Sequence, residues 1–161
     1  MNTMRITPLN IDLAQQVLPL MQLGGPFLQA RTASDYWLYA HLFASTCPVA
    51  HIGDDLAGAV VAFRSQEDPN DLYIQDVITH PDFRRRGVTT ALLNHVRTWA
   101  IEVGCGRLYL TSEPGNVRAH ATWMSLGFKN IPGDRVVDDI WVISDYKGPG
   151  KDRAVYELTL R

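Results

Sequence analysis

A strand, a basic glycine turn and a helix follow one another around the stretch from Asp76 to Leu93, and this order restricts the folds open to the chain. The β-branched, apolar residues of 73–79 predict the strand, which stops at Pro81 because proline cannot donate to a strand ladder. Apolar residues then recur with a period near 3.6, which predicts a helix. That face consists of Val88, Ala91, Leu92, Val96, Trp99, Ala100 and Val103.

The turn between this strand and this helix has the composition of an anion-binding site. Free backbone N–H groups and the positive dipole end at a helix start attract an anion. Arg84, Arg85 and Arg86 add positive charge, and Gly87 allows a close approach to the backbone. Phosphate is the anion that this pattern favours.

Two motifs resemble those of the GNAT family of N-acetyltransferases. Arg84-x-x-Gly87-x-Thr89 is similar to the family signature Gln/Arg-x-x-Gly-x-Gly/Ala, a turn that grips the pyrophosphate of acetyl-coenzyme A. The stretch from Asn116 to Phe128 resembles the family's later helix, which ends in Leu-Gly-Phe. The likeness covers about residues 50–130. Thr89 departs from the usual Gly/Ala, so its side chain must point away from the phosphates or bond to them.

Composition excludes several other classes of protein. With 161 residues the chain has the length of one domain, 1–161, large enough to bury a real core. Its 46% hydrophobic and 20% charged residues indicate neither disorder nor a fibre. A net charge of −2 argues against nucleic-acid binding, which needs an excess of cations.

The sequence shows no pattern typical of disulfides, of a metal site or of a membrane-spanning segment. Cys47 and Cys105 make no disulfide framework, and no Cys/His cluster has metal-ligand spacing, so no metal is expected. No apolar run is long enough to span a membrane, and the first eight residues lack the apolar core of a signal peptide. We therefore expect a cytoplasmic protein with free thiols.

Strands alternate with helices, which predicts an α/β or α+β mixed sheet. The resemblance narrows this to the GNAT acyl-CoA N-acyltransferase fold, a mostly antiparallel central sheet whose parallel middle strands splay apart between flanking helices. Strands are expected at 3–8, 48–53, 56–65, 71–79, 107–112, 128–131, 140–143 and 154–160. Helices are expected from Asn10 (interrupted or kinked by Pro19), from Thr32 or Ser34 to Ser45, from Val88, and from Asn116 to Gly127. Residues 132–152 predict either a flap near the substrate or an elaborated surface loop.

The resemblance implies an acetyl-coenzyme A site. The cofactor arm would lie along the strand ending at Thr79 as an added strand would, and the arginine turn would hold the pyrophosphate. Asn116 matches a family position that contacts the cofactor, and it also fits a plain N-cap. The implied cofactor residues are Val77, Ile78, Thr79, Arg84, Arg85, Arg86, Gly87, Val88, Thr89, Thr90, Asn116 and Trp123.

Catalysis of acetyl transfer needs proximity and a base. A thioester already reacts with an uncharged amine, so holding the two together supplies much of the rate. An alkylamine, with a pKa of about 10.4, must first lose a proton. Asp76 is the candidate base because many family members carry an acid there and apolar neighbours would raise its pKa; the alternative is a structural aspartate. Glu113 is the second candidate, against a plain first-turn helix acid.

One family feature is missing. Many members carry a general-acid tyrosine four residues before the glycine of Leu-Gly-Phe, where this chain has Trp123. Indole cannot give up a proton at useful pH, so the role is vacant or has moved. Tyr73, Tyr109 and Tyr146 are candidate replacements. His120 has a pKa suited to proton transfer, although a histidine on an amphipathic helix is usually structural.

We predict an acetyl-coenzyme A-dependent N-acetyltransferase that acts on a primary amine of a small molecule. A likeness to diaminobutyrate acetyltransferases in 36–43 and 71–77 favours amino-acid or polyamine-like acceptors. A protein or aminoglycoside amine would fit the same scaffold. The alternative from another class is a non-catalytic acyl-coenzyme A-binding or regulatory domain, for which Trp123 is the best argument. Homodimers are common in the family, but this chain shows no dedicated signal for one.

Overall fold

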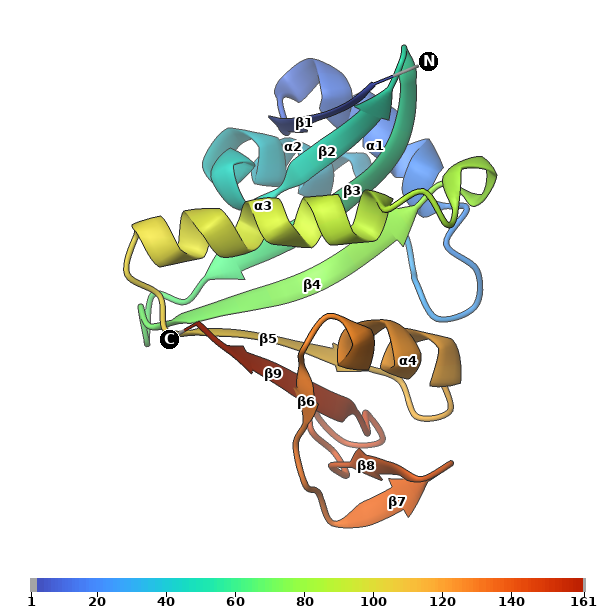
Figure 1. The fold of residues 1–161 in the computed structure, drawn as a ribbon, viewed down its shortest axis with the longest axis vertical. Helices are drawn as coiled ribbons and strands as arrows, with labels where there is room; N and C mark the ends of the chain where they lie inside the picture. Colours follow the sequence, from blue (N-terminus) through green and yellow to red (C-terminus); the bar gives the residue numbers. More distant parts are fainter. Residues whose placement is uncertain (1–2, 161) are drawn as a thin grey trace.

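Residues 3–160, which the computed structural model describes, are built around a sheet with helices on both of its faces (Figure 1). The seven-stranded sheet has the order β1-β2-β3-β4-β5-β9-β6, and only the β4–β5 pair is parallel. Its strands are β1 (Met4–Pro8), β2 (Pro48–Ile52), β3 (Asp55–Arg64), β4 (Asp71–Thr79), β5 (Arg107–Ser112), β6 (Lys129–Asn130) and β9 (Ala154–Thr159). The helices are α1 (Ile11–Met21), α2 (Ala33–Leu42), α3 (Val88–Glu102) and α4 (Val117–Ser125). A separate hairpin joins β7 (Arg135–Val137) to β8 (Ile140–Val142).

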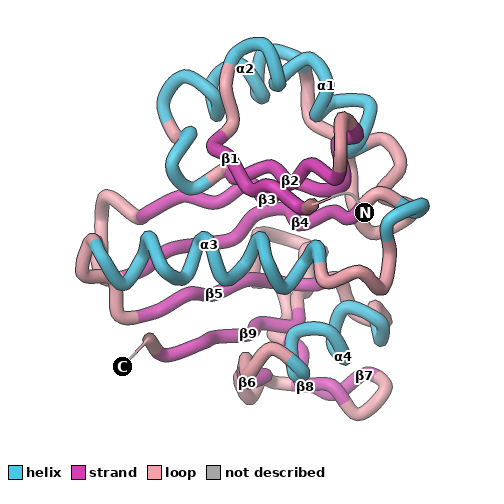
Figure 2. The backbone as a smooth tube through the Cα atoms, turned by 45° about the horizontal axis from the view of Figure 1, so that its top comes forward, coloured by secondary structure: helices cyan, strands magenta, loops and turns pink. Residues whose placement is uncertain are grey.

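The sheet separates the core into two layers, and helices cover each of them. Figure 2 shows α1 and α2 on one side of β1–β4 and α3 on the other. Under α3, Val88, Leu92 and Val96 pack into one buried cluster, and α1 and α2 cover a second cluster around Met21 and Tyr36. The mostly antiparallel mixed sheet with one parallel pair is the predicted fold, and the structure confirms it. No helix within 3–160 is long and apolar enough to cross a membrane.

The parallel pair is short, and this shapes the whole molecule. β4 and β5 pair only from Asp71 with Arg107 to Ile74 with Leu110. Beyond that point the two strands diverge, as their ribbons show in Figure 1. The last five residues of β4 therefore have no strand partner on their β5 side. The predicted splay of the middle strands is confirmed.

A β-bulge in β4 changes which way its side chains point. Val61 of β3 pairs with Asp76, but the next residue, Ala62, pairs with Ile74, which leaves Gln75 as an extra residue. Ile74 packs in the cluster under α3, whereas Ile78 packs in the cluster under α1 and α2. Strand alternation alone would put both on one face. The bulge therefore turns Asp76 toward the α1–α2 face, as bulges near functional sites often re-aim a side chain.

Local capping explains where the helices begin. Asn10 Oδ1 accepts the Leu13 N–H at 2.8 Å, as predicted for an N-cap. Thr32 and Asp35 form a reciprocal capping box at the start of α2. α3 differs, because its N-cap is Gly87 and no described side chain caps it. Its first N–H groups remain available to a ligand.

Several sequence expectations need correction. Pro19 lies inside α1, which continues to Met21; one missing N–H two residues from the end costs the helix little. α2 ends at Leu42, and a short 3-10 turn replaces its expected last residues. β7 was not predicted, because a three-residue strand is too short to show alternation.

Gly58 lets α3 lie directly against the sheet. A Cβ at this position would stand 2.6 Å from Val88 Cγ1 and 2.7 Å from the Ile78 carbonyl oxygen. Val88 is the first residue of α3, so this contact sets the height of the helix start above β3 and β4. Only a residue without a side chain permits that approach.

We therefore expect Gly58→Ala to lower the free energy of unfolding by about 1–3 kcal/mol, through overpacking against Val88 and the Ile78 backbone. Urea denaturation measures the change. A loss within about 0.5 kcal/mol, as for an ordinary surface substitution, would show that the helix start is not seated on Gly58.

Candidate active site

A cleft with a volume of about 740 Å³ opens where β4 and β5 separate. Its walls come from the ends of these two strands, the first turns of α3 and α4, and the connection between α1 and α2. A cleft of this size, at a break in a sheet, is a typical place for a small-molecule site.

Almost all of the predicted site residues line this cleft. They are Asp76, Val77, Ile78, Thr79, Arg84, Arg85, Gly87, Val88, Thr89, Thr90, Glu113, Asn116 and Trp123. Arg86 does not line it, because its guanidinium carbon lies 5.5 Å from the centre of the Phe83 ring. The prediction thus included one arginine of the triplet that the structure turns away from the cleft.

The turn before α3 is curled by two left-handed residues. Gly87 has φ +76°, and nothing lies within 4 Å of where a Cβ would stand. Arg85 has φ +64°, an uncommon conformation for a residue with a side chain and one that often marks functional turns. Together with the uncapped start of α3, this turn presents backbone N–H groups and two guanidinium groups to the cleft.

Thr89 and Asn116, for which the sequence allowed more than one role, both have defined hydrogen-bond partners. The hydroxyl oxygens of Thr89 and Thr79 lie 2.9 Å apart, so this pair ties the end of β4 to the first turn of α3. Asn116 Oδ1 accepts the Ala119 N–H at 3.1 Å, which confirms that it caps α4. Since Asn116 also lines the cleft, capping leaves its amide nitrogen for a ligand.

Asp76 is a buried carboxylate without a hydrogen bond to one of its oxygens. Its side chain is 8% exposed, and Oδ2 lies 3.6 Å from Arg31 Nε, too far for a hydrogen bond. Both of these buried atoms lack a hydrogen-bond partner in the described part of the chain. Burial raises the pKa of Asp76, while the charges of Arg31 and Lys147 oppose that rise. A polar ligand would complete this site.

Arg31 is positioned by a buried tyrosine. The hydroxyl oxygen of Tyr36, a fully buried residue of α2, accepts the Arg31 N–H at 2.8 Å. Burial in the core raises the pKa of Tyr36, so it stays neutral. The capping box at Thr32 fixes the next residue of the chain. The backbone of Arg31 and of the residue that follows it is therefore held in place.

Residues 132–152 contribute to the cleft through Lys147. The turn is internally tied: the Asp145 N–H donates to Asp152 Oδ1 and the Gly150 N–H to Asp145 Oδ1, both at 2.8 Å. Lys147 Nζ donates to the Tyr73 hydroxyl at 2.5 Å. The two alternatives for this segment were a flap near the substrate and a surface loop; Lys147 lines the cleft, so part of the segment lies beside it.

Trp123 occupies the place of the missing tyrosine as a buried donor. It is 9% exposed, and its Nε1 donates to Ser112 Oγ at 3.0 Å. Tyr73, Tyr109 and Tyr146 do not line the cleft, and His120 Nδ1 lies 2.7 Å from the Tyr156 hydroxyl. None of the replacements considered from sequence is therefore free in the cleft.

Among the cleft-lining residues that sequence reasoning did not single out are four polar ones: Arg31, Ser112, Lys147 and Arg153. Three of them lie in connections without periodicity, where no pattern could identify them. Ser112 stands at the end of a predicted strand, and that position was the signal available. In the described residues no group of three or more His, Cys, Asp or Glu side chains could hold a metal ion.

Comparison with known proteins agrees with this geometry. Residues 17–128 match the model of the acetyltransferase (GNAT) family. The L-2,4-diaminobutyric acid acetyltransferase of Vibrio cholerae is 33% identical over 69 residues, which are 43% of this chain and 40% of that protein. The protein of the same name from Methylotuvimicrobium alcaliphilum is 28% identical over 87 residues, 54% and 51% of the two chains. The chain thus matches about half or less of the length of these curated relatives.

A solved structure shares the whole fold. The diaminobutyrate acetyltransferase of Paenibacillus lautus, in complex with L-2,4-diaminobutyric acid and coenzyme A, superposes with a TM-score of 0.79. The two chains are 18% identical, and the match covers 99% of this chain and 96% of that one.

The buried charge of Asp76 predicts a pH-dependent change in stability. Because the folded-state pKa lies above its ordinary value of 3.8, the ionised carboxylate destabilises the fold at neutral pH. We expect Asp76→Asn to raise Tm at pH 8. The gain should shrink as the pH falls through the folded-state pKa and disappear below the ordinary value, where aspartate is protonated in both states. Thermal unfolding followed by circular dichroism measures it.

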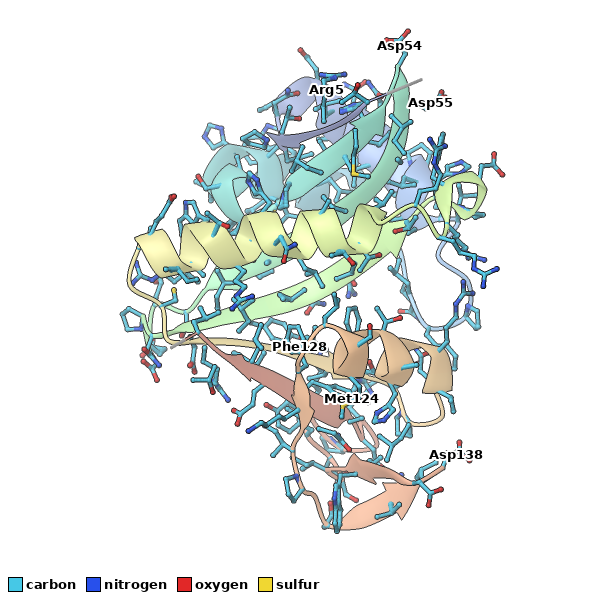
Figure 3. All side chains as sticks on the ribbon, in the orientation of Figure 1. Arg5, Asp54, Asp55, Met124, Phe128 and Asp138 are labelled. Atoms are coloured by element: carbon cyan, nitrogen blue, oxygen red, sulfur yellow. The ribbon has the colours of Figure 1, made fainter. Side chains whose placement is uncertain are left out.

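Asp54→Asn is the matched control, since Asp54 is exposed at the tip of the β2–β3 hairpin (Figure 3). It should leave Tm unchanged across the same range. A Tm for Asp76→Asn at pH 8 equal to or below that of the parent would mean that the cations beside Asp76 outweigh its desolvation.

Proposed function

Because the chain belongs to the acetyltransferase (GNAT) family, we propose that it transfers an acetyl group from acetyl-coenzyme A to a primary amine of a small, amino-acid-like molecule. The observation that carries this proposal is one cleft with two different ends. One end has an uncapped helix start beside Arg84 and Arg85, and the other has the buried, incompletely bonded carboxylate of Asp76.

The first end fits the diphosphate of the donor. Arg84 and Arg85 supply charge, and the first N–H groups of α3 supply donors that no side chain in 3–160 caps. The edge of β4 beyond Ile74 has no strand partner on the β5 side, so Val77 to Thr79 can pair with an amide-containing arm as with an added strand. A backbone N–H on this edge is the donor we assign to the thioester oxygen.

Asp76 is the residue we assign as general base. The bulge at Gln75 turns it toward the α1–α2 connection, the side on which an acceptor can enter. Its raised pKa makes the carboxylate a better proton acceptor than an ordinary aspartate. Glu113 also lines the cleft, but it follows the end of β5 as an exposed residue and is not buried as Asp76 is.

The charges around Asp76 favour an acceptor with a carboxylate. The charges of Arg31 and Lys147 act on this one buried acid, and Arg153 lines the same cleft. A carboxylate on the acceptor would pair with these cations while its amine faces Asp76. A polyamine or an aminoglycoside brings only positive charge and would be repelled. The names of the two curated relatives also favour a diamino acid over the polyamine-like alternative.

An acceptor test compares L-2,4-diaminobutyrate with 1,3-diaminopropane, the same diamine without its carboxylate. We expect thiol release from acetyl-coenzyme A with kcat/KM at least about tenfold higher for the amino acid, one charged hydrogen bond being worth that much. Lys147→Gln and Arg31→Gln should reduce the preference.

Equal rates on the two diamines would contradict the carboxylate assignment. Tight binding of acetyl-coenzyme A without turnover of any amine would instead favour the non-catalytic acyl-coenzyme A-binding alternative.

A cofactor test uses the three neighbouring arginines. Arg84→Gln and Arg85→Gln, on the cleft, should each weaken coenzyme A binding about tenfold, as loss of a charged phosphate contact does. Arg86→Gln removes the same charge from a side chain packed on Phe83, and its effect should stay within about twofold. Isothermal titration calorimetry measures all three. Equal losses would show that bulk charge, not the turn geometry, binds the cofactor.

A further inference from the structure

We propose that Ser112 donates a hydrogen bond to the cofactor sulfur as the thiolate leaves, and that Trp123 orients the Ser112 hydroxyl for this role. The proposal rests on the acetyl-transfer function proposed above. It assigns the task of the missing tyrosine to a serine of β5 rather than to another tyrosine.

The position of Ser112 follows from the register of the sheet. The last β4–β5 pair joins Ile74 to Leu110. Ser112 stands two residues beyond this pair on β5, and Asp76 stands two residues beyond it on β4. Both side chains line the cleft, and each is 8% exposed. The proposed base and the proposed donor are thus the buried polar side chains at the two rims of the opening.

The two side chains lie on opposite faces of the sheet. β5 alternates so that Ser112 shares a face with Leu108 and Leu110, which pack in the cluster under α3 together with Trp123 of α4. The bulge at Gln75 puts Asp76 on the other face, toward α1 and α2. An arm that fills the gap therefore meets Asp76 on one side and Ser112 on the other. The attacking amine and the leaving sulfur can then be contacted by different side chains.

Trp123 fixes which way the serine hydrogen points. The indole N–H can only donate, and it donates to Ser112 Oγ at 3.0 Å. The Ser112 hydrogen must then point elsewhere, and no hydrogen bond in 3–160 gives it an acceptor. Trp123 is itself held against Phe128, with ring centres 6.2 Å apart. A hydroxyl with one lone pair engaged and its proton unused is an oriented donor at the cleft wall.

The other hydroxyls on the cleft are committed or misplaced. Thr79 and Thr89 bond to one another, and Thr122 donates to the Arg118 carbonyl oxygen at 3.1 Å. Thr90 belongs to the first turn of α3, at the diphosphate end. Thr111 points to the opposite face of β5 from Ser112. Ser112 is therefore the hydroxyl that fits the sulfur.

The chemistry balances without proton loss from serine. The amine electron pair forms the new C–N bond, the C–S bond breaks, and its electron pair stays on sulfur. The proton from nitrogen passes to Asp76. Serine is a much weaker acid than a thiol, so Ser112 stabilises the thiolate by a hydrogen bond and keeps its own proton. The thiolate takes its proton from water, and Asp76 returns its proton to water.

The test measures the sulfur contact directly, with coenzyme A and desulfo-coenzyme A as probes. Ser112→Ala should raise the pKa of the bound coenzyme A thiol, followed by thiolate ultraviolet absorbance. At a pH where the thiol is ionised, the same variant should weaken the binding of coenzyme A about tenfold and that of desulfo-coenzyme A less than twofold. kcat should fall roughly 10- to 100-fold with little change in the acceptor KM. Ser112→Thr, which keeps the hydroxyl, should restore most of the affinity for coenzyme A and most of kcat.

A second variant guards against misfolding. Trp123→Phe keeps an aromatic ring but removes the orienting N–H, and it should shift the thiol pKa in the same direction. Ser125→Ala, an exposed serine on α4 away from the cleft, is the matched control.

An unchanged thiol pKa and an unchanged ratio of the two affinities in both variants would overturn the proposal, even if kcat fell. Failure of the parent protein to acetylate any amine would overturn the proposed function instead, since the thiol measurement needs no acceptor.

Discussion

The short pairing of β4 with β5 is the constraint on which the rest of the structure depends. Four residues on each strand pair, and the strands then separate while both still belong to one sheet. A fully paired β4 would offer no main-chain groups to a ligand, and α3 would start beside a closed sheet. The opening exposes a backbone edge, aims the start of α3 at a cleft, and leaves two buried polar residues, Asp76 and Ser112, on its rims.

The polar groups of the cleft are held indirectly. Asp76 faces the α1–α2 side because Gln75 is inserted in β4, and Arg31 stands beside it because a buried tyrosine of α2 holds its backbone. Ser112 is oriented by an indole packed in the core. In each case a buried, ordered group fixes a side chain whose own bonding is incomplete. Pre-organisation of this kind costs stability and is typical of sites that act on a ligand.

Sequence patterns predicted what depends on local rules. The bounds of β4 and β5 followed from alternation, and Asn10 and Asn116 were recognised as caps because a side-chain amide satisfies free N–H groups at a helix start. The bulge was not predictable, because inserting Gln75 leaves the apolar pattern of β4 intact. Arg31 and Lys147 lie in irregular connections and reach the cleft through tertiary contacts alone. The arginine triplet showed charge, but only the fold separates Arg86 from its two neighbours.

Some walls of the cleft are made of strand and helix residues, and others are made of loops. The groups proposed to bind the diphosphate and the arm come from β4 and α3, whose residues also build the core, so few substitutions are tolerated there. The cations around Asp76 come from the α1–α2 connection and from the turn after β8, which add no strand to the main sheet. Loops of this kind accept change more readily than the elements they join. If the proposed reaction holds, the choice of acceptor can therefore diverge during evolution while the donor-binding half of the cleft stays as it is.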